Sequence, residues 1–433
     1  MRHFLIAALL LLLALPAAAQ APEPAAVTQL RRLLGADVQL SFERATATDV
    51  AGSAVLTAAV LRRQNETIRI AEARLEGLRE DGIARLSLRG IAIGGGALTA
   101  TLERLDLEGL TIRRPPVGAK VEPQHVAADL LRIEGWRSLG DTPVNIGAIS
   151  IEGFGAGRVG HASMTGFELG APAMVIADRL TIARVAYAGL DAADILSAII
   201  AQRQPRRTPG RQSLEIEGMA LSQAGAPVAR ISAVTLRGEI SEGRPHTGAF
   251  ALRGLEVMST PAIAEWMQRL GYERLRADAR MDATHDIAAQ RLELTEFGIS
   301  LSNLGEVSLA FAADGVGENV DAASAQSARL LSARLRYADL SLFQRWLRTE
   351  AARERIAEPA LRQRLIQQSA AAMPGPRMAD ARNAVARFLR GEATVLELTS
   401  APRAPLRMSM VTGKPQSSLD GWQNMFGLTL TAR

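Results

Sequence analysis

Residues 291–316 read RLELTEFGIS LSNLGEVSLA FAADGV, and apolar side chains alternate with polar ones along two runs of this segment. The apolar positions are Leu292, Leu294, Phe297, Ile299 and Leu301 in the first run, and Val307, Leu309 and Phe311 in the second. The turn residues 303–305 separate the runs, which predicts an antiparallel strand pair with one buried face. An extra residue around Glu296 shifts the phase of the first run and predicts a β-bulge.

The same alternation recurs along much of the 433-residue chain, with helical patterns between the predicted strands. Helices are predicted at 27–36, 124–139, 192–204, 260–271, 341–355, 359–372, 378–390 and 419–426. We therefore predict a β-dominated α+β fold. It has a long, curved, mainly antiparallel sheet, short helices packed on that sheet, and a helical segment near the C-terminus. The last predicted strand, 428–432, is expected to return to the sheet.

Composition shifts and a Pro-rich linker at 205–210 indicate the division of the chain. We expect a signal peptide at 1–19, a spacer at 20–26, a first antiparallel β-rich region at 27–210, a second at 211–337, and a helical segment with closing strands at 338–433.

A short phrase of the form apolar-x-Gly-apolar-x-apolar recurs inside the predicted strands. It occurs at 88–93, 107–112, 164–169, 216–221 and 252–257, with looser copies beginning at Leu75 and Ile151. Glycine inside a strand marks a bulge or a bend. Bends in register predict an open trough, whereas ordinary hairpins in two stacked sandwiches are the alternative.

The composition excludes several classes of protein. Apolar residues make up 48% and charged residues 22% of the chain, which is typical of a globular protein. The formal charge is only +5, and acidic residues are interspersed among the basic ones, so the basic stripe that nucleic acid requires is missing. We therefore expect no nucleic-acid partner.

The N-terminus resembles a secretory signal. Arg2 and His3 precede an apolar run at 4–15, and small residues at 17–19 form a cleavage site. We expect export to the periplasm by a cleaved signal peptide, with an uncleaved anchor as the alternative. The chain has no cysteine, which removes disulfides, thiolate metal sites and thiol catalysis.

No catalytic, cofactor or metal site is predicted. Residues 155–160, GAGRVG, match a dinucleotide-binding fingerprint by letters, but a strand pattern follows where the phosphate-binding helix belongs. The histidines outside the signal peptide are scattered, and His285 beside Asp286 is interpreted as a loop pair. Asp314, Glu318 and Asp321 lack the spacing of a dedicated calcium loop. We expect no enzymatic activity.

The segment 345–364 is rich in arginine, with glutamates three or four positions away. A solvated, salt-bridged helix face explains this pattern. Contact with a membrane surface is the alternative, with Phe343, Trp346 and Leu347 as inserted side chains. All four tryptophans, including Trp136, fall in predicted helices, where we expect them to fasten helices to the sheet rather than to stack on a ligand.

Strand phrases such as residues 148–154, AISIEGF, recur along a cysteine-free chain with a signal-like N-terminus. In this style residues 38–337 resemble AsmA-like proteins of the Gram-negative envelope and the β-rich periplasmic proteins of the YdgA type. The resemblance implies a curved antiparallel sheet with an apolar interior used in phospholipid or lipoprotein handling. The cleavable signal departs from the uncleaved anchor of AsmA-like proteins, which puts a membrane-bridging role in doubt.

Two functions remain from these observations. The first is a periplasmic protein that shelters or transfers lipid acyl chains in an apolar groove, with phospholipid or a membrane surface as partner. The second is a structural protein with a filled core and no ligand, whose partners are envelope proteins. The candidate groove residues are Phe297, Ile299, Leu301, Leu309 and Phe311, each of which also suits a plain core.

Overall fold

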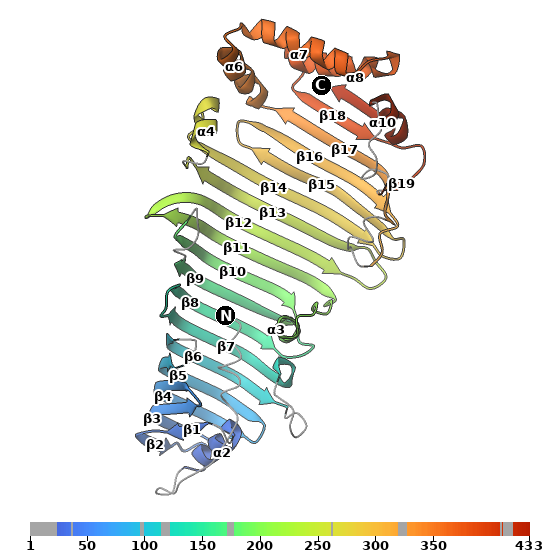
Figure 1. The fold of residues 1–433 in the computed structure, drawn as a ribbon. Helices are drawn as coiled ribbons and strands as arrows, with labels where there is room; N and C mark the ends of the chain where they lie inside the picture. The colour runs from blue at the N-terminus through green and yellow to red at the C-terminus, as the bar shows by residue number, and fades with distance from the viewer. Residues whose placement is uncertain are drawn as a thin grey trace. The chain divides into compact units, whose positions relative to one another are not determined.

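The computed structural model describes residues 24–35, 38–95, 99–113, 122–170, 177–260, 263–318, 327–407, 409 and 419–433. The chain divides into two compact units, residues 1–226 and 227–433 (Figure 1). The predicted signal peptide and most of the spacer lie outside the described residues. The predicted border at residue 210 falls at the start of the last long strand of the first unit.

The first unit is a meander of antiparallel strands with two helices. Its strands are β1 (Gln39–Ser41), β2 (Arg44–Ala47), β3 (Ala54–Arg63), β4 (Glu66–Arg79), β5 (Gly82–Gly94), β6 (Ala100–Ile112), β7 (Val126–Ser138), β8 (Val144–Phe154), β9 (Gly160–Gly170), β10 (Arg179–Leu190) and β11 (Gly210–Gln223). Its helical elements are α2 (Ala25–Leu34), the 3₁₀ turn η1 (Pro123–His125) and α3 (Ala192–Ala201). From β3 to β11 each strand pairs with the next one in the chain, while β1 and β2 pair with opposite halves of β3.

The second unit repeats the meander and then adds helices. Its strands are β12 (Ala226–Ile240, whose first residue belongs to the first unit), β13 (His246–Met258), β14 (Arg274–Asp286), β15 (Arg291–Leu301), β16 (Gly305–Asp314), β17 (Arg329–Asp339), β18 (Val395–Ser400), β19 (Leu406–Arg407) and β20 (Leu428–Ala432). Its helical elements are α4 (Ala264–Leu270), α6 (Leu342–Glu354), α7 (Glu358–Ala372), η2 (Pro376–Met378), α8 (Ala379–Arg390) and α10 (Leu419–Phe426). The final strand β20 pairs with β18, which confirms its predicted return to the sheet. The predicted fold class is confirmed.

The segment 291–316 forms the predicted strand pair. Strands β15 and β16 are antiparallel and join at a turn between Leu301 and Gly305. Leu294 pairs with Ala283 of β14 and Glu296 pairs with Asp282, so Thr295 between them is the extra residue of the predicted bulge. The prediction of one buried face is wrong, because most apolar side chains of this pair are half-buried and Ile299 is 39% exposed.

The glycines of the recurrent phrase lie at bends of the strands, as predicted. Their φ angles are all near +60°, at Gly90, Gly109, Gly166, Gly218 and Gly254. At Gly90 a Cβ atom would lie 2.9 Å from the Cβ of Ala71 on the neighbouring strand, so a side chain does not fit there. The bend also shifts the alternation by one residue. Leu88 and Ile91 are three positions apart, yet both pair with residues of the same apolar face. The phrase therefore keeps a bent strand apolar on one side.

The predicted helix at 124–139 is wrong, because Val126–Ser138 forms strand β7. Gly135 has a φ of 65° and shifts the phase between two buried side chains, Ile133 and Trp136. Apolar residues three positions apart then imitate the spacing of a helix. Trp136 is consequently a buried strand residue, and only the other three tryptophans lie in helices.

The first unit has a large continuous core. Helix α2 turns Val27, Leu30, Leu33 and Leu34 inward, and these residues join one cluster with side chains from β3 to β8. Leu110 of β6 is fully buried. The buried clusters among the described residues of the second unit are much smaller and lie near its helices and loops.

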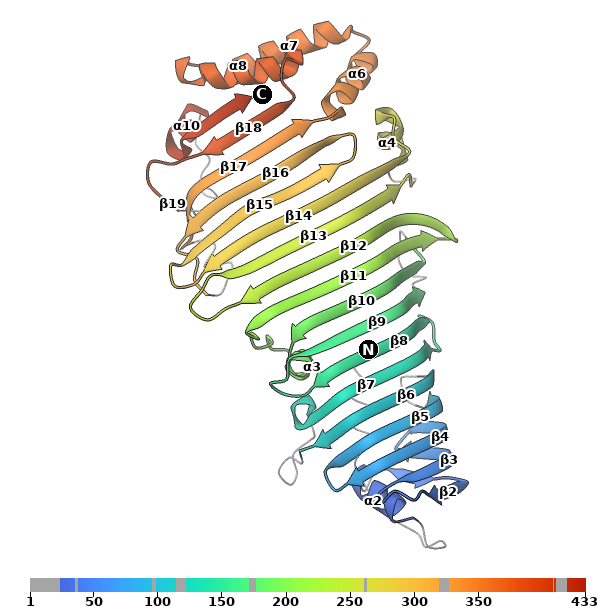
Figure 2. The ribbon, with the colours of Figure 1, turned by 180° about the vertical axis from the view of Figure 1, so that it is seen from behind.

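Helix α8 protects the edge of the second unit. It packs against β18 and β20 through Ala384, its Phe388 contacts Tyr337 of β17, and it lies beside β20 in both views (Figure 2). Arg387 donates a hydrogen bond to the carbonyl oxygen of Ala432 on β20, at 3.1 Å. Covering an edge strand in this way blocks pairing with another chain.

Candidate functional site

Two uninterrupted rows of mostly apolar residues cross the sheet of the second unit. In each row every residue is the direct cross-strand partner of the next. The first row is Leu236, Phe250, Met281, Phe297, Leu309, Leu335, Leu398 and Leu430. The second row is Val234, Leu252, Ala279, Ile299, Val307, Tyr337, Leu396 and Ala432. We call the surface formed by these sixteen residues the apolar face.

Much of the apolar face is open. Val307 and Leu335 are each 43% exposed, and the neighbouring Phe297 and Leu309 are half-buried. Exposed large apolar side chains that are contiguous indicate a binding surface, whereas scattered ones do not. Among the described residues, helix α8 covers the end near β18 and β20, where Leu396 and Leu430 contact the cluster around Ala384, and its Phe388 also contacts Tyr337 of β17.

The other side of the same strands carries charge. Arg280 pairs with Glu296 across β14 and β15 at 2.5 Å, and Arg336 pairs with Glu306 across β17 and β16 at 3.8 Å. The four side chains are between 35% and 57% exposed, so these pairs add little stability. They make the two sides of the sheet different, because the charged side stays in water while the apolar face is available to an apolar ligand.

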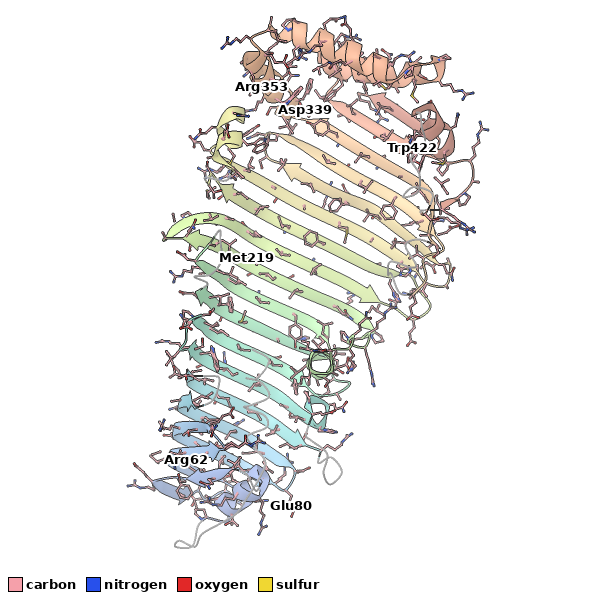
Figure 3. All side chains as sticks on the ribbon, in the orientation of Figure 1. Arg62, Glu80, Met219, Asp339, Arg353 and Trp422 are labelled. Atoms are coloured by element: carbon pink, nitrogen blue, oxygen red, sulfur yellow. The ribbon has the colours of Figure 1, made fainter. Side chains whose placement is uncertain are left out.

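A similar row in the first unit is buried in part. It runs through nine strands as Leu56, Ala73, Leu88, Leu105, Ile133, Ile149, Met164, Val185 and Ile216. Leu56 is 1% exposed and Ile133 is 4% exposed, whereas Leu88, Leu105 and the members on β8 to β11 are half-buried. Met219 of β11, labelled in Figure 3, belongs to a parallel row with Phe167 and Ile182.

The five residues predicted to line a groove share the exposed side of β15 and β16. Phe297 faces Leu309, and Ile299 faces Val307. Leu301 follows at the end of β15, where its partner is Gly305. Phe311 faces Leu294 and contacts a small buried cluster around Ala313. The structure brings the five together on one surface and does not bury them in a core.

The sequence prediction omitted most of this surface. Val307 lies between Ile299 and Tyr337, and Leu335 lies between Leu309 and Leu398. Strict alternation in β17, where Leu335 and Tyr337 are separated by arginine, was a usable signal. The order of the strands decides which residues become cross-strand neighbours, and this order is known only from the fold.

The other candidate motifs form no common site. Gly160 begins strand β9, so no helix follows the glycine-rich letters of 155–160, and the amide of Gly157 donates to the carboxylate of Asp191 at 2.7 Å. Asp314 accepts two hydrogen bonds from Arg329, at 2.8 and 3.0 Å, and Asp321 lies outside the described residues. His285 lies in a strand, not in a loop as predicted.

A juxtaposition that the sequence did not suggest is the direct cross-strand pairing of His246 with His285. The Nε2 atom of His285 lies 3.3 Å from the carbonyl oxygen of Val316. Within the described ranges no three His, Asp or Glu side chains converge as metal ligands would. No helix in the described part of the chain has the length and apolar character to cross a membrane.

The junction between β17 and α6 is fixed by a buried polar pair. The hydroxyl of Tyr337 donates to Oδ1 of Asp339 at 2.7 Å, and the same oxygen accepts the amide of Phe343 at 2.8 Å. Burial, followed by this hydrogen bond, raises the pKa of Tyr337. Asp339 is the last residue of β17, just before α6, and Arg353 lies near the end of α6 (Figure 3). The carboxylate thus holds the first turn of α6 against the apolar face.

Comparison with known proteins reaches only part of the chain. A family model described as "Uncharacterized protein" matches residues 298–433, which is less than a third of the chain. The matched region begins in β15 and extends through the helices to β20. No curated protein and no solved structure matches the chain. The function must therefore be argued from the molecule itself.

Proposed function

We propose that this protein is a non-enzymatic envelope protein that shelters or transfers lipid acyl chains along the apolar face of its second unit. One observation carries the proposal. Two uninterrupted rows of mostly apolar residues cross eight strands, and their central members are left half-exposed or exposed.

The dimensions of the apolar face suit an acyl chain. Neighbouring strands lie about 4.8 Å apart, so a row across eight strands spans roughly 34 Å. The hydrocarbon core of a bilayer is about 30 Å thick and consists of two layers of acyl chains, so one acyl chain needs only about half the length of a row. Each methylene removed from water contributes about 0.8 kcal/mol, so a chain lying along a row gains affinity without a charged or hydrogen-bonding partner.

The periplasm of a Gram-negative envelope is the compartment that we propose. The apolar run at 4–15 and the small residues at 17–19 support it. The resemblance of the strand phrases to AsmA-like proteins also supports lipid handling. In this compartment the chain meets phospholipid on both sides, which gives a carrier its cargo.

The alternative, a structural or interaction protein without a ligand, is supported by the first unit. Its core is continuous and its largest buried side chains, such as Leu75 and Leu110, are at most 2% exposed. A filled β-structure of this kind suits a spacer or a scaffold. The open face of the second unit is the feature that this alternative leaves unexplained.

A titration with a fluorescent acyl probe, followed by competition with phospholipid, tests the proposal. We expect saturable binding of the probe to the full chain and its displacement by added phospholipid. A signal that rises linearly and is not displaced shows nonspecific adsorption and favours the scaffold.

A further inference from the structure

We propose that helices α4 and α6 form a docking surface for an anionic phospholipid bilayer. The surface centres on three exposed side chains, Trp266, Leu340 and Trp346, which we call the tryptophan rim. This inference goes beyond acyl-chain binding and does not depend on it, because a protein can dock on a bilayer without removing a lipid.

The three side chains of the rim lie at one end of the sheet of the second unit. Helix α4 follows the end of β13, and Leu340 follows the end of β17, two strands that run in the same direction. The carbonyl oxygen of Leu304, in the turn after β15, accepts the amides of Leu340 and of the two residues after it at 3.0 Å. The exposed fractions are 49% for Trp266, 68% for Leu340 and 40% for Trp346.

Helices α4 and α6 are joined, so the two elements that carry the tryptophans of the rim are held together. The hydroxyl of Thr349 donates to the carbonyl oxygen of Arg269 at 2.9 Å. Arg345 reaches the carbonyl oxygen of Gly271 at 3.5 Å, and its guanidinium lies 4.6 Å from the ring centroid of Tyr272. These contacts connect the end of α4 to the middle of α6.

Trp346 is held in place although it is exposed. Its ring is stacked on Phe343 with a centroid distance of 5.9 Å, and Phe343 lies 5.2 Å from the ring of Phe388 on α8. A fixed aromatic ring with one open side loses little entropy when it enters an interface. Leu347, predicted to insert into a membrane, is fully buried, and Phe343 serves as support.

Charge selects the partner. Residues 338–433 contain fourteen basic and eight acidic side chains, whereas the whole chain has 50 basic and 45 acidic residues. The positive excess of the protein therefore lies in this part of the chain. The side chains of Arg348 and Arg353 on α6 are 74% and 64% exposed, and each also forms an ion pair, Arg348 with Glu358 at 3.6 Å and Arg353 with Glu350. Tryptophan prefers the interface of a bilayer, and arginine near it attracts anionic headgroups.

The rim also adjoins the apolar face. Leu340 lies three residues beyond Tyr337, which belongs to the second row, and Phe388 contacts the Tyr337 ring edge-on at 6.0 Å. A bilayer docked on the rim would therefore lie beside the strand ends that adjoin this row. Docking and acyl-chain binding would then be two steps in the transfer of the same lipid.

Vesicle flotation of the full chain tests the docking surface. We expect flotation with vesicles of phosphatidylcholine and phosphatidylglycerol, little with phosphatidylcholine alone, and a decrease at high salt. The double variant Trp266→Ala/Trp346→Ala should bind at least about tenfold more weakly. Leu139→Ala is the matched control, because Leu139 is 60% exposed in the first unit and should leave binding unchanged. Arg348→Glu should weaken binding, whereas Arg244→Glu, in the turn between β12 and β13, should not.

Tryptophan emission of the unmodified chain gives a second measurement that does not depend on a variant folding. We expect a blue shift on addition of anionic vesicles and quenching by brominated acyl chains. Equal binding to both kinds of vesicle, or flotation without an emission change, overturns the proposal. If the unmodified chain does not float with anionic vesicles but binds the acyl probe, docking alone is overturned. If it floats but does not bind the probe, acyl-chain binding alone is overturned.

Discussion

Phe297 and Leu309 face each other across β15 and β16, in the middle of a row whose members are direct neighbours on eight strands. Both side chains are half-buried, although their positions in the strands are central. A soluble sheet normally covers such a row with a second layer. The exposure at the middle of this row leaves apolar surface that an acyl chain can cover.

A charge placed on the apolar face should abolish acyl-chain binding. In the variant Val307→Asp the carboxylate reaches water, because Val307 is 43% exposed, and folding is spared. A ligand lying over it would have to desolvate the charge, so we expect at least about tenfold weaker probe binding.

The matched control for this substitution is Ser308→Asp. Ser308 lies next to Val307 in β16, but its side chain is on the charged side, where its cross-strand partner is Arg336. We expect unchanged probe binding. Equal losses in both variants would contradict a ligand site on one face.

Truncation of leucine should distinguish the filled unit from the open one. Leu110 is fully buried, so Leu110→Ala should lower the free energy of unfolding by about 2–5 kcal/mol. Leu335 is 43% exposed, so Leu335→Ala should lower the free energy of unfolding by less than about 1.5 kcal/mol. Urea denaturation followed by circular dichroism measures both. A large cost at Leu335 would indicate that the apolar face is covered in solution.

The bend at Gly90 should not tolerate a side chain. Its φ of +60° and the Ala71 Cβ at 2.9 Å make Gly90→Ala strained, with an expected loss of about 2 kcal/mol in the free energy of unfolding. Gly94 in the same strand has open space and an ordinary φ, so Gly94→Ala should be nearly neutral. Thermal unfolding of the two variants compares them directly, and similar melting temperatures would refute the bend.

The pair Tyr337 and Asp339 should make stability depend on alkaline pH. In the fold the pKa of Tyr337 is raised above the ordinary tyrosine value of 10.0, because the side chain is buried and donates a hydrogen bond to Asp339. Its contribution is therefore complete below pH 10.0 and is lost as the pH rises through the folded pKa. We expect the free energy of unfolding of the second unit to fall in this range.

Tyr337→Phe should remove this pH dependence. The variant should also lose about 1 kcal/mol at neutral pH, because the hydrogen bond to Asp339 is gone. Denaturation at neutral and alkaline pH, monitored by circular dichroism, measures both effects. An unchanged slope with pH in the variant would show that another group titrates.

The strands were predictable because alternation and turn residues are local. Residues 291–316, the Thr295 bulge and the bend at Gly90 all follow from patterns within one or two strands. The helix expected at 124–139 failed for a local reason as well, since Gly135 shifts the phase of β7 and imitates helical spacing.

The openness of the apolar face was not predictable. Phe297 and Leu110 have the same kind of sequence surroundings, yet one is half-exposed and the other is fully buried. The difference depends on what packs over each strand, which is a property of the whole unit. The rim likewise depends on α4 and α6 meeting, although Trp266 and Trp346 are 80 positions apart.

Native mass spectrometry with lipid extraction, on protein purified from the periplasm without detergent, tests the central claim most directly. The proposal predicts that phospholipid co-purifies in near-stoichiometric amount and is lost in Val307→Asp. A clean ligand-free mass, unchanged after incubation with envelope lipids, would contradict acyl-chain binding and leave the scaffold as the function.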